Sequence, residues 1–319
     1  MHRFLKTLFF SVVCLASTAV LFAQTQTVRI AALKGPTGLG MIKLFQEKPE
    51  LAPSVQSEYF AFASPDILLP RLLNGEIDVA ALPANLAVNI YNRKVPYALA
   101  AIIGNGVLYC VSTDPKIEGL ESLAGTTLQN VAKGSTPEFI LRHILEVKGL
   151  KDTVTVVYKY APMELAQVLI AGREKTGVLP EPFATKVLRA RPEAHIVCDF
   201  QEEWKKLYPD TPVYPMTALV VKIDFLKSHP DLVKKFLSLY QTSQDWVKKN
   251  PEEAGVLAES LSFGIEREDA KEAIPRCNLT YIPAKEAKFT MERFLNILLQ
   301  FAPESIGGKL PDDGFYAVP

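Results

Sequence analysis

Two short segments of the chain have the residue types and spacing to bind a small molecule. Residues 34–38 read Lys-Gly-Pro-Thr-Gly and follow an apolar run at 28–33, while residues 133–137 read Lys-Gly-Ser-Thr-Pro and precede apolar residues at helical spacing. Each pattern predicts a strand, a tight turn and the start of a helix. The first N–H groups of a helix have no partner within it and can bind a ligand, which glycine allows to approach the backbone. The alternative is an ordinary strand-to-helix turn.

The two segments belong to a longer internal similarity. Phe-Ala-Ser-Pro at 62–65 and Leu-Pro-Ala-Asn at 82–85 correspond to Tyr-Ala-Pro at 160–162 and Leu-Pro-Glu-Pro at 179–182. The offset shortens by one residue at each successive pair, which requires only single-residue gaps. Two halves whose strands end in loops that begin helices predict two similar α/β lobes with a cleft between them.

Turn signals and apolar runs indicate where the chain passes between the lobes. Asn105-Gly106 marks a turn that leads into the second lobe, and the apolar run at 218–222 is expected to carry the chain back. After residue 230 the pattern is only helical, and these helices are expected to pack on the first lobe. The predicted lobes are residues 24–107 plus 220–319 (lobe 1) and 108–219 (lobe 2).

Length and composition are those of a globular protein. The chain has 319 residues, enough for two lobes with their own cores, and 48% of its residues are hydrophobic. The 35 basic residues balance the 35 acidic residues. This balance gives no support to binding of nucleic acid or of an anionic membrane as the main role.

The N-terminus has the pattern of an exported protein. Basic residues at 3 and 6 precede an apolar run at 8–22, and Ala23 offers a small residue for cleavage. The pattern predicts a signal peptide over residues 1–23 and a periplasmic or other extracytoplasmic location; the alternative is a single N-terminal membrane anchor. Cys14 lies inside the apolar run, directly after Val13, which argues against a lipid anchor there.

The remaining cysteines and histidines do not form a recognisable reactive or metal-binding set. Cys110, Cys198 and Cys277 are odd in number and widely spaced, so they are not a disulfide framework and are expected to be buried thiols. Whether any two of them pair stays open. The histidines after the signal peptide stand alone in the sequence, which gives no support to a metal site. No cofactor is expected.

The chain resembles the periplasmic solute-binding proteins of ABC importers, of the nitrate/sulfonate/taurine and thiamine-precursor type. The segments that carry the resemblance span nearly the whole chain after the signal peptide: 28–38, 73–80, 123–136, 178–184 and 214–221. The resemblance implies a type 2-like periplasmic-binding-protein fold, in which two α/β lobes joined by two crossing strands clamp one ligand. It also implies a monomer that passes this small-molecule solute to an ABC permease in the inner membrane.

The resemblance further implies that strand-end loops hold the ligand. Helix starts offer N–H donors there, and Ser and Thr hydroxyls add selectivity. The alternative for each residue is a local helix cap, and Ser135 with Glu138 has the spacing of a capping box. The implied ligand-binding residues are Lys34, Gly35, Pro36, Thr37, Gly38, Ser64, Pro65, Pro83, Ala84, Asn85, Asn105, Gly106, Gly134, Ser135, Thr136, Pro137, Glu181, Pro182, Met216 and Thr217.

The residue types in these loops favour a heterocyclic or otherwise mainly neutral solute over a sulfonate. No arginine lies in the loops to bind a sulfonate or carboxylate in a bidentate manner. A glutamate at 181 would suit a ligand that donates hydrogen bonds. Nearby aromatic residues would suit a flat ring such as a pyrimidine or a flavin-like precursor: Tyr59, Phe60, Phe62, Phe139, Phe183 and Tyr214.

Two other functions stay open at this point. The first is an enzyme of related fold that acts on a small heterocyclic metabolite, but the chain lacks the cysteine cluster and histidines of thiamine-precursor synthases. No nucleophile–base pair or paired catalytic acids can be assembled either, so catalysis is not expected. The second is a secreted protein that senses its ligand instead of delivering it.

Overall fold

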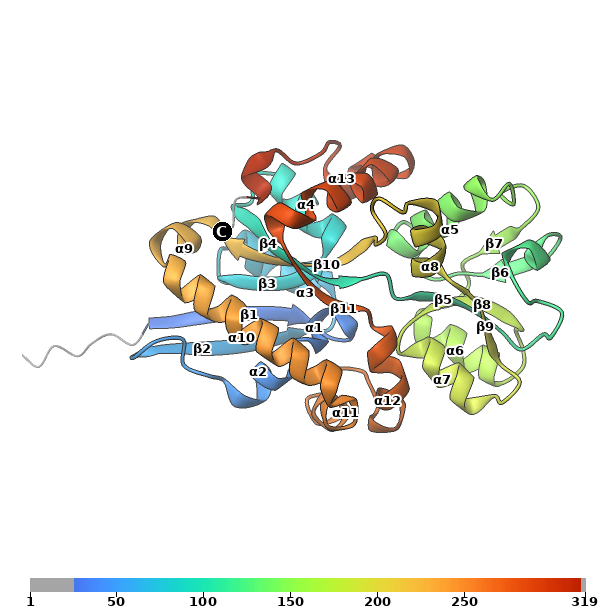
Figure 1. The fold of residues 1–319 in the computed structure, drawn as a ribbon, viewed down its shortest axis with the longest axis horizontal. Coiled ribbons are helices and arrows are strands. Elements are labelled where there is room, and N and C mark those ends of the chain that lie inside the picture. Colours follow the sequence, from blue (N-terminus) through green and yellow to red (C-terminus); the bar gives the residue numbers. More distant parts are fainter. Residues whose placement is uncertain (1–25, 317–319) are drawn as a thin grey trace, which may run out of the picture.

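The computed structural model describes residues 26–316 and shows two β-sheets, each flanked by helices (Figure 1). The lobe that contains residues 108–207 is drawn in green and yellow, beside the larger first lobe. The predicted signal peptide, including Cys14, lies outside the described residues. Within 26–316, no helix is long and apolar enough to cross a membrane.

The first sheet has six strands in the order β11-β4-β10-β3-β1-β2. Strands β1, β2 and β3 are parallel, whereas β10 runs antiparallel to its neighbours β3 and β4. Every residue of β4 is buried, as its almost wholly apolar sequence requires when helices cover both faces of a sheet. The strands are β1 (Gln26–Leu33), β2 (Val55–Phe62), β3 (Val79–Pro83), β4 (Tyr97–Asn105), β10 (Pro215–Lys222) and β11 (Leu279–Pro283).

The second sheet has five strands in the order β7-β6-β8-β5-β9. Strand β6 is parallel to β7 and β8, and β5 runs antiparallel to β8 and β9. Counted from β2 in the first sheet and from β7 in the second, each sheet has three parallel strands, one antiparallel strand and then a strand parallel to the first three. The first sheet adds β11 at its other edge. This shared order matches the internal similarity of the sequence. The strands are β5 (Leu108–Ser112), β6 (Thr127–Gln129), β7 (Thr155–Val157), β8 (Thr176–Pro180) and β9 (His195–Asp199).

Helices cover the faces of both sheets. The first lobe has α1 (Pro36–Leu39), α2 (Ile42–Glu47), α3 (Pro65–Leu73), α4 (Ala84–Asn92), α9 (Ile223–Ser228), α10 (Pro230–Lys249), α11 (Pro251–Ser260), α12 (Arg267–Arg276) and α13 (Ala284–Phe301). The second lobe has α5 (Thr136–Val147), α6 (Pro162–Ile170), α7 (Phe183–Ala190) and α8 (Phe200–Leu207). Short 3-10 helices lie at Leu120–Leu123, Pro303–Ile306 and Asp313–Tyr316.

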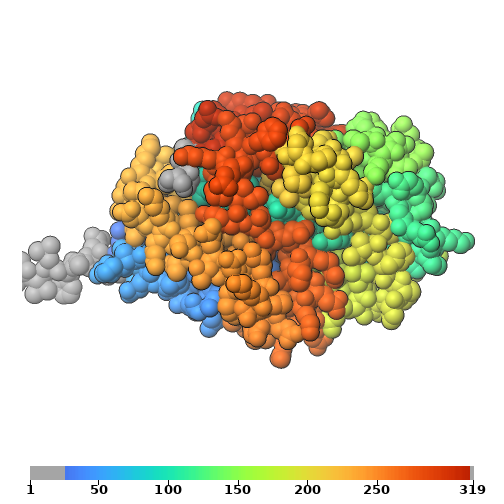
Figure 2. Space-filling model, viewed as in Figure 1, coloured from blue at the N-terminus to red at the C-terminus, as the bar shows by residue number. Residues whose placement is uncertain are grey.

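The C-terminal part is mainly helical, as predicted, but it also contains strand β11. This strand was missed because it is short and lies between two strongly helical segments; it pairs with β4 at the edge of the sheet. Helices α10 to α13, orange and red in Figure 2, cover one face of the first lobe. Helix α13 also packs against α5 and therefore contacts both lobes.

The chain passes between the lobes twice, from β4 to β5 and from α8 to β10. One side chain, that of Gln201 on α8, holds both connections. Its Oε1 accepts hydrogen bonds from Gly106 N (3.0 Å) and Tyr214 N (3.4 Å), and its Nε2 donates to Pro212 O (2.9 Å). Strand β10 lies in the first sheet over its whole length, and the residue-level lobe boundaries stay predictions.

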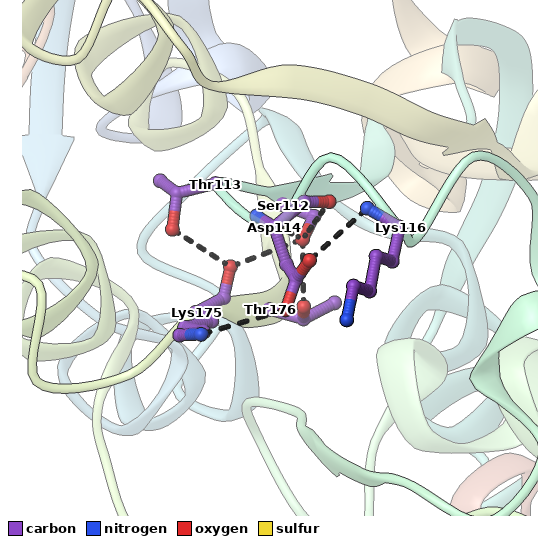
Figure 3. Close-up of polar contacts among 6 residues, drawn as sticks. All are labelled: Ser112, Thr113, Asp114, Lys116, Lys175 and Thr176. Atoms are coloured by element: carbon purple, nitrogen blue, oxygen red, sulfur yellow. Dashed lines mark hydrogen bonds and ion pairs between the residues drawn. The ribbon is translucent and has the colours of Figure 1, made fainter.

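A polar network fixes the far end of the β5–β8 pair (Figure 3). The hydroxyl oxygens of Ser112 and Thr176 lie 2.8 Å apart, and Lys175 Nζ lies 3.5 Å from Asp114 Oδ2. With this end of the pair fixed, the strand register places Pro180, at the other end of β8, opposite the first residue of β5. The loop after β8 is thereby held where the chain enters the second lobe.

Candidate ligand-binding site

A cavity of about 420 Å³ lies between the two lobes. The carboxyl ends of parallel strands from both sheets meet there, which is where open α/β sheets commonly bind ligands. The first lobe and the connection to the second contribute Lys34, Gly35, Pro36, Thr37, Ala63, Pro83, Gly104, Asn105, Val107, Met216, Thr217, Phe263, Gly264 and Cys277. The second lobe contributes Leu108, Thr136, Pro137, Pro180, Glu181, Pro182 and Phe183.

The structure brings most of the predicted ligand-binding residues to this one cavity. They come from loops that are far apart in the sequence, and both lobes are represented. Their contact with a ligand stays a prediction. The predicted residues that line the cavity are Lys34, Gly35, Pro36, Thr37, Pro83, Asn105, Thr136, Pro137, Glu181, Pro182, Met216 and Thr217.

Other predicted residues do not line the cavity. Gly38 and Gly106 have packing roles, because an added Cβ would lie 2.5 Å from Leu33 O and 2.0 Å from the Tyr214 ring, respectively. The remaining residues lie one or two positions from a lining residue in the chain. They are Ser64, Pro65, Ala84, Asn85, Gly134 and Ser135.

In the turn at 133–137, the residues just before Thr136 make hydrogen bonds to neighbouring protein groups. The Ser135 hydroxyl donates to Ala132 O at 2.5 Å and is therefore already occupied. Glu138 Oε2 accepts from Gly134 N at 2.6 Å, so the side chain reaches one residue before the expected capping-box partner. Gly134 has φ +79°, a conformation that glycine adopts without strain. This turn presents Thr136, the first residue of α5, to the cavity.

Sequence reasoning missed three lining residues from the C-terminal part of the chain. Phe263 and Gly264 lie between α11 and α12, and Cys277 directly follows α12. The Phe263 carbonyl accepts from Gly35 N at 2.7 Å, which holds this loop against the first turn. The internal similarity pointed only to strand-end loops, and these residues have no counterpart in the second half. The other unpredicted lining residues are Ala63, Gly104, Val107, Leu108, Pro180 and Phe183, and Phe183 was expected only as a nearby aromatic residue.

Glu181 is held by protein groups. Its Oε1 accepts from Arg276 Nε at 2.7 Å and from Thr185 Oγ1 at 3.0 Å, while Oε2 accepts from Thr185 N at 3.1 Å. The side chain has no exposed surface. Burial raises the pKa of the Glu181 carboxyl, and the hydrogen bond from Arg276 opposes this shift. Both carboxylate oxygens thus accept from protein donors, and a hydrogen bond from a ligand to Glu181 stays a prediction.

Three other polar side chains in the cavity wall remain available to hydrogen bond a ligand. Asn105, Thr136 and Thr217 are each more than nine-tenths buried, and none makes a side-chain hydrogen bond to another residue within 26–316. Asn105 ends β4 and Thr217 lies on β10 in the first lobe, whereas Thr136 begins α5 in the second. Lys34 also lines the wall and forms no ion pair within the described part of the chain. These groups can hydrogen bond a ligand from both lobes.

Of the aromatic residues expected near the ligand, Phe139 and Tyr214 are buried in the core, and Tyr59, Phe60 and Phe62 are partly buried against it. Of that group, only Phe183 lines the cavity. Tyr214 is fully buried against Trp204, with 5.4 Å between the ring centroids. Phe263 adds a second aromatic side chain from the opposite lobe, and its ring packs edge-on against Phe45. The wall is therefore mainly apolar with a few polar groups, as in many small-molecule sites.

A statistical model of the NMT1-like family matches residues 45–262, about two thirds of the chain. The chain belongs to the NMT1-like family. Its structure is similar to that of an ABC transporter protein from Parabacteroides distasonis, with a TM-score of 0.80 and 26% sequence identity. The alignment covers 92% of this chain and 99% of that chain. No curated protein matches this NMT1-like chain.

Two further solved structures share the fold of this NMT1-like protein. The periplasmic aliphatic sulphonate-binding protein of Escherichia coli has 14% identity and a TM-score of 0.70, with 90% of this chain and 92% of that chain covered. The periplasmic nitrate-binding protein of Synechocystis has 15% identity and a TM-score of 0.59, with 88% and 82% covered. The predicted resemblance to ABC-importer solute-binding proteins and the predicted two-lobe fold are confirmed.

In this NMT1-like protein, the histidines of the described residues make local structural contacts. His143 Nε2 lies 2.7 Å from Tyr208 Oη, and His195 Nε2 lies 2.8 Å from Ile117 O. Within residues 26–316, no three His, Cys, Asp or Glu side chains are grouped to hold a metal ion. Burial raises the pKa of the Cys277 thiol in the cavity wall, so this group stays a neutral thiol at physiological pH.

Proposed function

We propose that the protein is an extracytoplasmic solute-binding protein, exported by a signal peptide cleaved after residue 23. It binds one small organic molecule between its lobes and, as a monomer, delivers that molecule to an ABC permease in the inner membrane. The observation that carries this proposal is the set of Asn105, Thr136 and Thr217, which are buried in one cavity without side-chain partners among residues 26–316. Unpaired buried polar groups cost free energy, so a ligand that pairs them from both lobes would favour closure.

The solute is proposed to be heterocyclic or otherwise mainly neutral. Among the described residues that line the cavity, Lys34 supplies one cation without an ion-pair partner, and no arginine is present. The nearby guanidinium of Arg276 is paired with Glu181. A sulfonate would thus meet one point charge and no bidentate donor. Phe183 and Phe263 can instead contact the faces or edges of a ring from opposite lobes.

Binding is proposed in preference to catalysis. The Cys277 thiol is neutral, and the lining residues within 26–316 include no histidine to act as a general base. Two other lining residues, Lys34 and Glu181, are of types that can act as acid or base, but Glu181 is paired with Arg276, and neither makes a hydrogen bond to a lining Cys or Thr side chain within 26–316. The relatives named above are transport proteins, which agrees with this proposal.

Native mass spectrometry of the freshly purified protein tests the proposal. We expect one small organic molecule bound per chain, released unchanged on denaturation. Small-angle scattering with that molecule should then show a smaller radius of gyration than the emptied protein, because the lobes close. A protein that carries no molecule from its native cells, or that converts the molecule chemically, would contradict the proposed function.

A further inference from the structure

Two cysteines lie directly opposite one another in the second sheet. Strands β5 and β9 are antiparallel, and their register pairs Cys110 with Cys198, directly before a register shift between Cys110 and Val111. Opposed residues of an antiparallel pair point to the same face, with Cα atoms about 4.5–5.5 Å apart. This separation falls within the range of about 4.4–6.8 Å that a disulfide requires. Both side chains lie in the same buried cluster, whereas Cys277 belongs to a different one.

We propose that Cys110 and Cys198, which are free thiols in this structure, form a cross-strand disulfide in the exported protein. The inference goes beyond solute binding and uses only the extracytoplasmic location of the proposed function, because disulfides persist in oxidising compartments. The oxidant is a thiol–disulfide exchange partner. Two S–H bonds break and one S–S bond forms, while the disulfide of the partner accepts two electrons and two protons and becomes two thiols.

The disulfide would fix the part of the second lobe that holds both connections to the first. Strand β9 is the edge of its sheet. Asp199, directly after Cys198, caps α8 by accepting from Gln201 N at 2.8 Å. Gln201 in turn holds Gly106 and Tyr214 in the two connections. A covalent link between β5 and β9 therefore anchors the start of α8, and we expect it to raise the unfolding temperature.

Burial determines when the disulfide can form. It raises the pKa of the Cys110 thiol to about 12 and also raises the pKa of the Cys198 thiol. Exchange requires a thiolate, so the folded, reduced protein should react slowly. The disulfide is therefore expected to form while the chain folds. Refolding with oxidised glutathione should link the pair, whereas adding oxidised glutathione to the folded, reduced protein should leave most chains unlinked.

Peptide mapping tests the proposal on full-length protein isolated from the cell envelope. Free thiols are alkylated under denaturing conditions without reductant. We expect a linked peptide that contains Cys110 and Cys198, two hydrogen masses lighter than the separate peptides, with Cys277 alkylated. Alkylation of all three cysteines, or a link to Cys277, would overturn the proposal. If the chain is not exported, the proposed extracytoplasmic function is wrong. Refolding with oxidised glutathione then still tests whether Cys110 and Cys198 can pair.

Single cysteine variants supply the control. The parent and Cys277→Ser should both unfold at a lower temperature after refolding in dithiothreitol than after refolding with oxidised glutathione. Cys198→Ser should show no such difference. Equal unfolding temperatures for the linked and reduced parent would overturn the proposed stabilisation of the second lobe.

Discussion

Arg276 and Glu181 form an ion pair between the lobes, with 2.7 Å between Arg276 Nε and Glu181 Oε1. Arg276 is the last residue of α12 in the first lobe, and Glu181 follows β8 in the second. The Glu181 side chain is fully buried, whereas that of Arg276 is 28% exposed. Removing one charge therefore has different consequences on the two sides. A buried carboxylate cannot reach water, but a partly exposed guanidinium can.

We expect Arg276→Gln to destabilise the protein more than Glu181→Gln. Leaving a buried charge unpaired costs about 3 kcal/mol, whereas the freed Arg276 can use water and Glu272, 3.7 Å away. The double variant should lose less stability than the sum of the two single variants, since the pair is coupled. Urea unfolding of the three variants measures these differences. Additive losses would show that the two residues do not interact in solution.

Two more ion pairs continue the contact between α7 and the segment around α12. Arg189 Nη1 lies 2.8 Å from Asp269 Oδ1, and Lys186 pairs with Glu266. Because these pairs join the lobes, weakening them should favour the open form. Lys186→Glu is expected to lower solute affinity by up to about fivefold, within the range for partly exposed pairs. Titration calorimetry with the co-purified solute measures the loss.

The charge-swapped variant Lys186→Glu/Glu266→Lys is the matched control for this prediction. It keeps both residue types and restores opposite charges at the interface. Affinity should return close to that of the parent. If the swapped variant binds as weakly as Lys186→Glu, the loss comes from some other effect of the glutamate and not from the pair.

Glycine and threonine substitutions in the two turns predicted from the sequence should weaken binding to different extents. Gly35 and Gly134 have φ values of +83° and +79°, so valine at either position should strain the turn by about 1–3 kcal/mol and weaken binding. Thr136→Ala should cost about 1 kcal/mol of binding free energy, through one lost hydrogen bond. Titration calorimetry measures the order of these losses of binding free energy, and circular dichroism confirms that each variant is folded.

Ser135→Ala is the control beside Thr136, because the Ser135 hydroxyl donates to Ala132 O and does not line the cavity. It should bind the solute as tightly as the parent. If Gly134→Val also binds like the parent, the second turn is only an element of the fold, and the cavity assignment is wrong.

Much of the architecture was predictable because the repeated strand–turn–helix units leave a local signal in the sequence. The turn at 34–38 directly follows the end of β1 at Leu33, whereas the turn at 133–137 begins four residues after the end of β6 at Gln129. Those ends meet by topology alone, which explains why most predicted loops line one cavity. Short strand β11 lacked this support, since its flanking helices dominate the local pattern.

Side-chain roles at the site were less predictable because they depend on contacts between distant residues. Arg276 lies 95 positions from Glu181, and no local sequence pattern indicates that its guanidinium pairs with the Glu181 carboxylate. The hydrogen bond from Gly35 N to the Phe263 carbonyl oxygen holds Phe263 beside the first turn, and its segment has no counterpart in the second half of the chain. Tyr214 was expected near the ligand, but its ring fills the space beside Gly106.

The stability of the protein should fall at mildly acidic pH, in part because of His143. Burial lowers the pKa of this histidine below its ordinary value of 6.5, so the folded state favours the neutral ring. Its contribution to stability is therefore complete above pH 6.5 and is lost as the pH falls through the lowered folded-state pKa. In His143→Gln, the drop in unfolding temperature between pH 7.5 and pH 5 should be smaller than in the parent, by differential scanning fluorimetry. His229→Gln, in the first lobe, is the control; an equal drop in the parent and His143→Gln would contradict the assignment.

The crystal structure of the protein with its co-purified solute tests the central proposal most directly. We predict one molecule in the cavity, hydrogen-bonded to Thr136 of the second lobe and to Asn105 or Thr217 of the first. A solute bound elsewhere, or held by residues of one lobe only, would contradict the account.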